Sequence, residues 1–374
     1  MKRYLFLLIL FLILTLVSVE GKALDAGGEI ETYFTGILYD DNNLYTNLTE
    51  KLNLELFIPV YGNTESRVEF DFVNSSDSNI NNSFYTDSGG LLVKKLYIKH
   101  RSNKYNLTAG RQPISWSFGS LINPVDFNTR AEVMDEETSQ KYQDGVKLYI
   151  PFDWNTGLEL VGTWPRNTEK VNYTDDFKYG LRYRTGIEGY DVSFNYIKEP
   201  SYLTKDTISV QNQAQDRAGI SVKGDIGKAG TGIYGALHYK KEETDNLDEG
   251  DFDYLVGGDY SFTPQNLNKI NLQLEYLNSF NDFSDLISGL KERNKLLSGN
   301  VNYQLDEFSS LDFTGAYEIE EKGFILIPGY NNNIGENLEL SIRGTMMDDN
   351  IFTLPDQELL NVQGIIQAGL SYSF

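Results

Sequence analysis

Few residues in this 374-residue sequence have the types and spacing that catalysis or metal binding requires. The chain has no cysteine and only two histidines, His100 and His238, which excludes disulfides, thiol catalysis and cysteine-ligated zinc. His238 could act as a general base, but no serine or aspartate stands at a spacing that identifies a partner. The acidic run between 242 and 253 lacks the ligand spacing of a dedicated calcium loop. We therefore predict no catalytic residue, no cofactor and no metal site.

A set of basic residues could instead attract anions. Lys178, Arg182 and Arg184 stand at positions of one parity, so on a β-strand their side chains would point to the same face. Arginine forks fit carboxylates and phosphates, and a solute site made of Arg182, Arg184 and Arg217 is one interpretation. The alternative is that charges on a wetted wall only keep that wall hydrated.

Composition and the first residues indicate where the protein acts. With 54 acidic against 32 basic residues and a net charge of -22, nucleic acid and anionic membrane surfaces are unsuitable electrostatic partners. Lys2 and Arg3 precede an apolar stretch, and small residues follow at Gly21 and Ala23, which is the order of a secretory signal peptide. We predict a signal peptide over 1–23 and an exported body over 24–374. Beyond the signal, no apolar run approaches the roughly 18–20 residues that a spanning helix needs.

The elements that must position these side chains follow the period of a β-strand. Apolar and polar residues alternate in segments of about ten residues, most clearly at the C-terminus, where Leu370, Tyr372 and Phe374 share one face. The segment 324–331 is the least clear, because its first residues are uniformly apolar. The predicted strands are 29–38, 50–61, 65–73, 92–100, 104–111, 144–152, 157–164, 177–185, 189–198, 215–224, 229–240, 252–262, 270–278, 294–305, 309–318, 324–331, 337–347 and 360–374.

The connections between these segments alternate between long and short, beginning with a long one at 39–49. Tight turns on one rim and long loops on the other are typical of outer-membrane barrels, in which an even strand count places both termini on the tight rim. We predict an all-β, single-domain transmembrane antiparallel β-barrel of about 18 strands, with 16 as the alternative count, short periplasmic turns and long extracellular loops. A secreted solenoid or propeller is the soluble alternative.

Two stretches resemble known families. The terminal alternation ending at Phe374 resembles the C-terminal signal of outer-membrane barrels, which implies recognition by the barrel-assembly machinery. The second stretch resembles the Gly-Arg-Gln, Trp-Gly, Asn-Pro and Asp segment of porins related to alginate-export channels, with Ser117 standing where glycine is expected. Its matching residues are Gly110, Arg111, Gln112, Trp116, Asn123, Pro124 and Asp126.

The second stretch begins the longest connection, 112–143, between the fifth and sixth predicted strands. The loop at this place in general porins folds into the lumen, so the resemblance implies a constriction formed by residues 112–143; an extracellular cap is the alternative. An acidic loop tip facing a basic wall would create a transverse field across the channel. The predicted solute path and constriction consist of Arg111, Trp116, Asp126, Arg130, Asp135, Glu136, Glu137, Lys147, Lys178, Arg182, Arg184 and Arg217.

These features together predict an outer-membrane porin of a diderm bacterium that passes small hydrophilic solutes passively and is not an enzyme. Its expected partners are outer-membrane lipid, the assembly machinery and the solutes, and a homo-oligomer is left open. A structural or adhesive barrel, whose extracellular loops bind a partner, is the alternative. A barrel enzyme acting through His238 is the third hypothesis.

Overall fold

A computed structural model describes residues 25–39, 43–76, 90–116, 125–127, 142–164, 177–200, 202–203, 211–212, 215–227, 230–242, 251–265, 268–280, 293–320, 322–348 and 362–374. The predicted signal peptide, 1–23, lies outside these residues and stays a prediction. Across the described ranges, no helix has the length and apolar character needed to cross a membrane.

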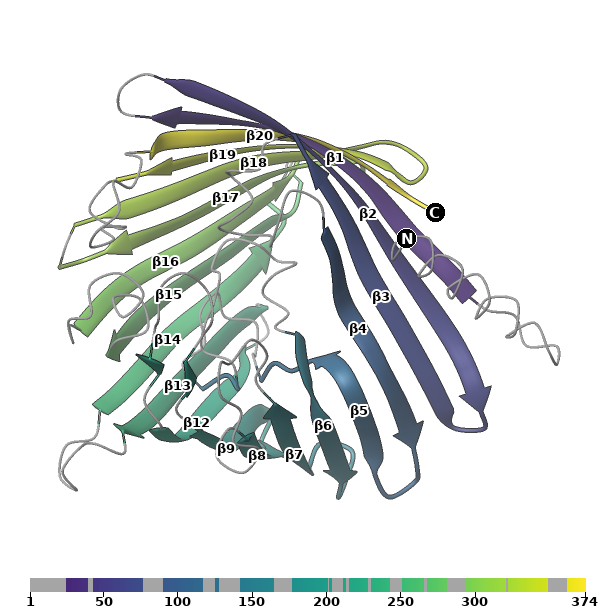
Figure 1. Ribbon diagram of the computed structural model, residues 1–374. Coiled ribbons are helices and arrows are strands. Elements are labelled where there is room, and N and C mark those ends of the chain that lie inside the picture. Colours follow the sequence, from purple (N-terminus) through teal and green to yellow (C-terminus); the bar gives the residue numbers. More distant parts are fainter. Residues whose placement is uncertain are drawn as a thin grey trace.

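The chain forms one antiparallel sheet of 18 strands and a separate two-stranded hairpin (Figure 1). The first half of the sheet consists of β1 (Asp25–Tyr39), β2 (Leu44–Tyr61), β3 (Thr64–Ser75), β4 (Gly90–Arg101), β5 (Asn106–Pro113), β6 (Tyr142–Pro151), β7 (Gly157–Trp164), β8 (Lys178–Ile187) and β9 (Tyr190–Glu199). The second half consists of β12 (Gln215–Ile226), β13 (Thr231–Glu242), β14 (Asp251–Phe262), β15 (Ile270–Phe280), β16 (Arg293–Gln304), β17 (Ser309–Glu318), β18 (Phe324–Gly335), β19 (Leu338–Met347) and β20 (Val362–Ser373). The hairpin pairs β10 (Tyr202–Leu203) with β11 (Gln211–Asn212).

The sheet closes on itself, which confirms the predicted barrel and the count of 18 strands. β1 pairs with β2 on one side and with β20 on the other, in a register that joins Glu29 to Ser373 and Ile30 to Tyr372. At the seam, the main chains of Gly28 and Phe374 exchange two hydrogen bonds of 3.0 and 2.9 Å. Closure leaves no free sheet edge, and this is the condition for a sheet to exist within hydrocarbon.

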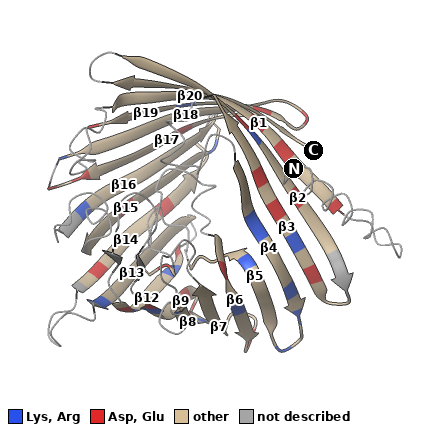
Figure 2. Cartoon of the chain, viewed as in Figure 1, with Lys and Arg blue, Asp and Glu red and all other residues tan. Residues whose placement is uncertain are grey.

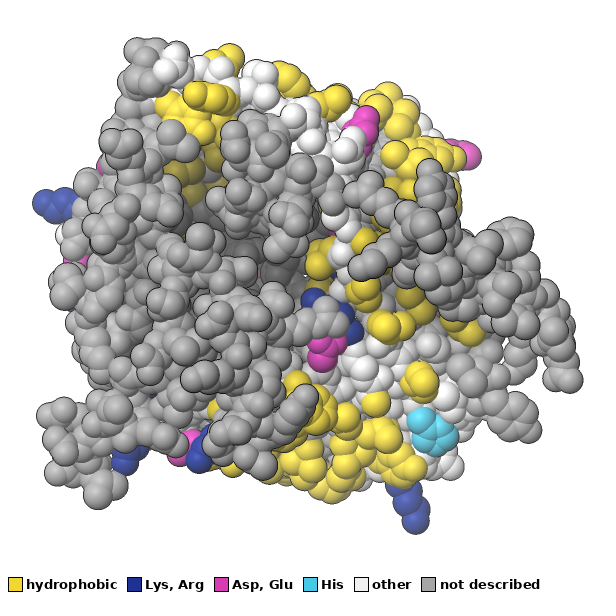
Figure 3. All heavy atoms as spheres, viewed as in Figure 1, with side chains coloured by type: hydrophobic (Ala, Val, Ile, Leu, Met, Phe, Trp, Pro, Cys, Tyr) yellow, Lys and Arg dark blue, Asp and Glu magenta, His cyan; other side chains and the backbone are white. Residues whose placement is uncertain are grey.

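The two faces of the barrel wall differ in chemistry. Outward side chains such as Ile30, Phe34 and Leu370 are exposed and apolar. Neighbouring inward positions carry charges, as in the Lys51–Glu31 pair. Figure 2 shows acidic and basic residues along the strands, and Figure 3 shows hydrophobic side chains gathered over the outer surface. The predicted alternation therefore separates a surface suited to lipid from an interior suited to water.

Connections on one rim of the barrel are tight. Two residues join β2 to β3, β8 to β9 and β18 to β19, and left-handed backbone at Gly62, Gly189 and Asn337 makes these turns possible. In the turn after β16, the carboxylate of Asp306 accepts hydrogen bonds from the main-chain N–H groups of Phe308 and Ser309, and these bonds lower the pKa of Asp306. This rim, which also carries the start of β1 and the end of β20, is called the turn rim below.

Every predicted segment overlaps one strand of the barrel, and the boundaries that differ by four residues or more are the starts of β1 and β2 and the end of β18. β2 begins at Leu44 because residues 44–49 continue to pair with β1, so the first connection is 40–43 rather than 39–49. The threonine and asparagine residues in this stretch resemble a loop in composition, although the buried Asn47 stands next to the outward Leu48 in regular alternation. β18 continues to Gly335 through an irregularity after Asn333. The small hairpin of β10 and β11 was not predicted.

Candidate functional site

Two short pieces of the long connection after β5 pack on the lumen side of the wall. Ile114, Trp116, Val125 and Phe127 are each 0–1% exposed. Ile114, Trp116 and Phe127 form a cluster with Val161 of β7 and Ile197 of β9. The sequence neighbours Leu160 and Tyr196 are exposed on the outer face, so Val161 and Ile197 point inward. Val125 packs with side chains of β13, β14 and β15, namely Tyr234, Ala236, Leu255 and Leu277. The described residues 114–116 and 125–127, called the inner loop segments below, therefore lie inside the barrel.

Hydrogen bonds join the inner loop segments to each other and to the wall. The carboxylate of Asp126 accepts a 2.6 Å bond from the Trp116 main-chain N–H and a 2.9 Å bond from the Ser115 hydroxyl. The Trp116 indole N–H donates to Oε1 of Glu159 on β7 at 2.5 Å. Trp116 and Asp126, both predicted at the constriction, thus meet in space although ten residues separate them.

Two glycines leave space in the wall for these side chains. A Cβ atom on Gly180 of β8 would stand 2.7 Å from Cη2 of Trp116 and 2.9 Å from Cε2 of Phe127. A Cβ atom on Gly219 of β12 would stand 2.6 Å from Cγ1 of Val125. Such approaches are too short for any residue but glycine without movement of the loop.

Lys178 and Arg217, which were predicted to line the solute path, are buried beside the inner loop segments. Glu199 of β9 accepts from Nζ of Lys178 at 3.1 Å and lies 3.3 Å from the Arg217 guanidinium. Arg217 also donates to the main-chain carbonyls of Asp126 at 3.2 Å and Phe127 at 2.9 Å. The Lys178 ammonium lies 4.6 Å from the centre of the Phe127 ring. Arg217 therefore binds the loop main chain and Lys178 lies against the Phe127 ring, while Glu199 pairs with both cations.

A basic cavity of about 250 Å³ lies nearer the turn rim, between β4 and β8. It is lined by Lys99, Asn106, Thr108, Lys147, Tyr149, Gly157, Glu159, Arg182 and Arg184. Among the described residues, no side chain forms an ion pair or hydrogen bond with Lys147, Arg182 or Arg184, and Lys99 only approaches Glu65 at 4.0 Å. Glu159 is the one acidic residue among the described residues of the lining, which thus carry excess positive charge.

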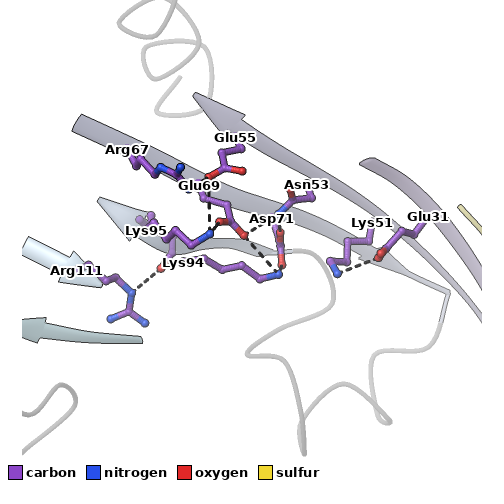
Figure 4. Close-up of polar contacts among 11 residues, drawn as sticks. Glu31, Lys51, Asn53, Glu55, Arg67, Glu69, Asp71, Lys94, Lys95 and Arg111 are labelled. Carbon is purple, nitrogen blue, oxygen red and sulfur yellow. Dashed lines mark hydrogen bonds and ion pairs between the residues drawn. The ribbon is translucent and has the colours of Figure 1, made fainter. Parts of the chain in front are cut away.

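On β1 to β4, a second group of lumen-facing basic residues forms ion pairs with carboxylates of the neighbouring strands. Lys51 pairs with Glu31 at 2.9 Å and Arg67 with Glu55 at 3.1 Å. Lys94 pairs with Asp71 at 2.9 Å, and Lys95 pairs with Glu69. Figure 4 shows these pairs and Asn53, which donates to Glu69 and Asp71. These four pairs are called the paired network below.

A β-bulge adds Lys94 to the paired network. The register between β3 and β4 shifts after Glu69, and the side chains of the consecutive residues Lys94 and Lys95 both reach carboxylates on β3. Strict alternation predicts only Lys95 on the lumen side, so Lys94 was missed. The outward face resumes at Leu96, which is exposed.

The remaining predicted site residues divide into two groups. Arg111 donates from Nε to the Val93 carbonyl at 2.5 Å and lies 3.5 Å from Asp144 of β6, so contacts with neighbouring strands hold it. Arg130, Asp135, Glu136 and Glu137 lie outside the described residues, and the predicted acidic loop tip stays a prediction.

His238 of β13 faces Asp253 of β14, with Nδ1 and Oδ2 3.5 Å apart and both side chains buried. Over the described ranges, no group of three histidine, aspartate or glutamate residues could hold a metal ion.

Sequence reasoning missed Gly180, Gly219, Glu199 and Lys94. Gly180 and Gly219 occupy lumen-facing positions between charged or polar residues of the same parity, Lys178 and Arg182 in one strand and Arg217 and Ser221 in the other. A glycine at such a position marks a close approach by another part of the chain, and this signal was available. The pairing of Glu199 depends on cross-strand register, which one sequence does not give.

Comparison with known proteins supports the fold. No family model and no curated protein matches the sequence. Among solved structures, a BenF-like porin from Pseudomonas fluorescens Pf-5 superposes with a TM-score of 0.60 at 12% identity, covering 94% of this chain and 99% of that one. OccAB3 of Acinetobacter baumannii superposes with a TM-score of 0.59 at 10% identity, covering 94% of this chain and 99% of that one. OccK5 (OpdH) of Pseudomonas aeruginosa superposes with a TM-score of 0.58 at 8% identity, covering 94% of this chain and 98% of that one.

The chain thus has the fold of 18-stranded outer-membrane porins. The more specific resemblance to alginate-export-type porins gains no support from these structures and stays a prediction from residues 110–128 alone.

Proposed function

We propose that this chain is an outer-membrane porin that passes small hydrophilic solutes by passive diffusion and performs no chemistry. The observation that carries this proposal is the closed 18-stranded wall with apolar residues outside and charged or polar residues inside. A barrel of this size is wide enough to leave an aqueous channel. The similar structure from Pseudomonas fluorescens is itself called a porin, which supports the same role here.

The connection 112–143 would form the constriction of this channel. Its inner loop segments pack on the lumen side of β7 to β15, where they occupy part of the cross-section. Trp116 and Asp126 would give the loop its fold, while Lys178 and Arg217 would hold it in place. In the alternative arrangement, the loop would form a cap outside the barrel and would have no contact with lumen-facing side chains.

The basic cavity would give the channel a preference for anions at the level where solutes pass the wall of β4 to β8. Lys147, Arg182 and Arg184 line this cavity, and no described side chain forms an ion pair or hydrogen bond with them, so their positive charge would act on a solute there. Charge that is focused in a narrow aqueous passage raises the local concentration of the opposite ion. Because the chain is acidic overall, the preference should be local and mild.

The proposal is tested by swelling of liposomes that contain the purified protein. Uncharged sugars of increasing size should enter, with rates that fall as the solute approaches the width of the channel. Rates equal to those of protein-free liposomes, with the barrel shown to be folded, would contradict the proposal.

The constriction is tested separately by deleting residues 125–138. A folded barrel with this deletion should show a larger unitary conductance, because it would lose residues 125–127, which pack on the lumen side. An unchanged conductance would place the loop outside the path.

A structural or adhesive barrel is the alternative function, and it predicts a closed lumen with binding that depends on the extracellular loops. Recognition by the barrel-assembly machinery through Phe374 belongs to either function; this residue is exposed at the seam of β1 and β20. The alginate-export-type ancestry of residues 110–128 is likewise kept as a proposal, carried by those residues alone.

A further inference from the structure

The guanidinium of Arg217 makes different contacts from those of Arg182 and Arg184, which line the basic cavity. It is 1% exposed, whereas Arg184 of β8 is exposed in the basic cavity. Its two terminal nitrogens donate to the main-chain carbonyls of Asp126 and Phe127. A buried guanidinium that binds loop main chain is not available to a passing solute, so attraction of anions does not explain its position.

Glu199 fixes the direction of this guanidinium. Its carboxylate lies between Lys178 and Arg217 and also accepts a 3.2 Å bond from the Gln215 side chain. Removal of the Glu199 charge would leave Lys178 and Arg217 buried together without the carboxylate that they share, so this side chain holds both cations in place. A planar arginine fork transmits that geometry to its acceptors better than a flexible ammonium does.

The wall beside Arg217 is shaped for the same three residues, 125–127. Gly180 and Gly219 leave room for Phe127 and Val125, and the Asn195 side chain donates to the Val125 carbonyl at 3.3 Å. Main-chain bonds and apolar contacts thus converge on one docking position that spans β8, β9 and β12.

We propose that Arg217, oriented by Glu199, is the positioning residue of this channel: it fixes residues 125–127 on the wall and so sets how far the loop stands into the lumen. The expected effect, a constant channel width, rests on the proposed porin function. The docking itself does not depend on that function.

The docking is measured by a cysteine pair, Val125→Cys with Gly219→Cys. The natural chain has no cysteine, so a disulfide can only report this contact. A Cβ atom built on Gly219 stands 3.4 Å from Cβ of Val125, close to the mean of about 3.8 Å in disulfides. Substitution of Val125 also removes the Cγ1 atom that would otherwise meet the new side chain at 2.6 Å.

Oxidation of the pair is followed by mass spectrometry in three backgrounds, each checked for a folded barrel: the otherwise natural chain, Arg217→Met and Arg343→Met. Arg343 on β19 is the matched control, because among the described strands β19 pairs with β18 and β20, away from the contacts of residues 125–127. We expect the rate of disulfide formation to fall by about tenfold in Arg217→Met and to stay unchanged in Arg343→Met. A tenfold fall is equivalent to a loss of about 1.4 kcal/mol in the free energy of docking. Equal rates in the two variants would overturn the proposal.

Two further variants keep the test decisive if Arg217→Met does not fold. Glu199→Gln keeps the arginine but removes the charge that orients it, and Arg217→Lys keeps the charge but loses the fork. Both should slow disulfide formation by less than Arg217→Met would, and a natural rate in both would contradict the proposed role.

Conductance separates this inference from the porin function. Arg217→Met should give noisy open-channel currents, and the disulfide should restore steady currents until it is reduced. If disulfide formation slows as expected but neither protein conducts, the positioning role stands and the porin function fails. Noise that persists after the disulfide has formed would show that Arg217 does not act through the docking of residues 125–127.

Discussion

The paired network on β1 to β4 and the basic cavity between β4 and β8 use the same kinds of residue to opposite effect. In the paired network, four basic side chains each meet a carboxylate, as Lys51 meets Glu31. In the basic cavity, Lys147, Arg182 and Arg184 have no such partner among the described residues, and Glu159 is bonded to Trp116. A lumen-facing charge therefore says little by itself. Arg182 lies opposite Glu159 in register, yet Glu159 accepts from Trp116, so the contacts that a carboxylate makes decide whether the basic residue is paired within the wall.

The largest expected difference between the two regions is in stability. Lys94→Met should destabilise the barrel by about 3–5 kcal/mol, because it leaves Asp71 buried without its main partner. Arg182→Met should change the free energy of unfolding by about 0.5 kcal/mol or less, since no pair is broken. Urea-induced unfolding in lipid vesicles measures both values. Equal losses would remove the distinction between the two regions.

Ion selectivity should depend more on the basic cavity than on the paired network. Replacing both Arg182 and Arg184 by glutamate should lower the anion-to-cation permeability ratio by about tenfold at low salt, the lower end of what focused charge achieves. The effect should shrink at 1 M salt, where the screening length is about 3 Å. Arg343→Glu on β19 serves as a control for adding negative charge elsewhere in the lumen. A permeability ratio that does not move would mean that solutes do not pass the basic cavity.

The next effect concerns the wall that receives the loop. Gly180→Ala should cost about 1–3 kcal/mol through overpacking against Trp116 and Phe127. Gly344→Ala is the matched control, because its new Cβ atom would meet nothing closer than 3.5 Å. Thermal unfolding in detergent compares the two variants, and similar losses would show that the inner loop segments do not press on β8.

The smallest effect is expected at the contact between loop and cavity. Trp116→Phe keeps the aromatic ring but removes the indole donor to Glu159, at a cost of about 1 kcal/mol. The freed carboxylate should also lower the anion-to-cation permeability ratio, by less than the double arginine reversal does. A ratio higher than that of the natural chain would contradict the position assigned to Glu159.

Most of the fold could be predicted because lipid and water impose a strict alternation on each strand. The period of two at Leu370, Tyr372 and Phe374 reappears as one outward face, and each of the predicted segments became a strand. Failures occurred where the alternation is interrupted. The bulge at Lys94 turns a second lysine inward, and residues 44–49 of β2 have the composition of a loop although they pair with β1.

The candidate site was less predictable, because its chemistry depends on contacts between distant parts of the chain. Parity assigned Lys178, Arg182, Arg184 and Arg217 to one polar face. In the structure, Lys178 and Arg217 lie beside the inner loop segments, and Arg182 and Arg184 line the basic cavity. It could not separate Arg217, which contacts residues about ninety positions earlier, from Arg184, which lines the cavity. That distinction needs the register of β8, β9 and β12 and the path of the loop, and neither is encoded in local spacing.

The most direct test of the central claim, a water-filled channel, is single-channel recording of the purified full-length protein in a planar bilayer. We expect discrete current steps whose size grows with KCl concentration, because ions would cross through the polar lumen. A folded, inserted barrel that gives no current steps at any salt concentration would contradict the account.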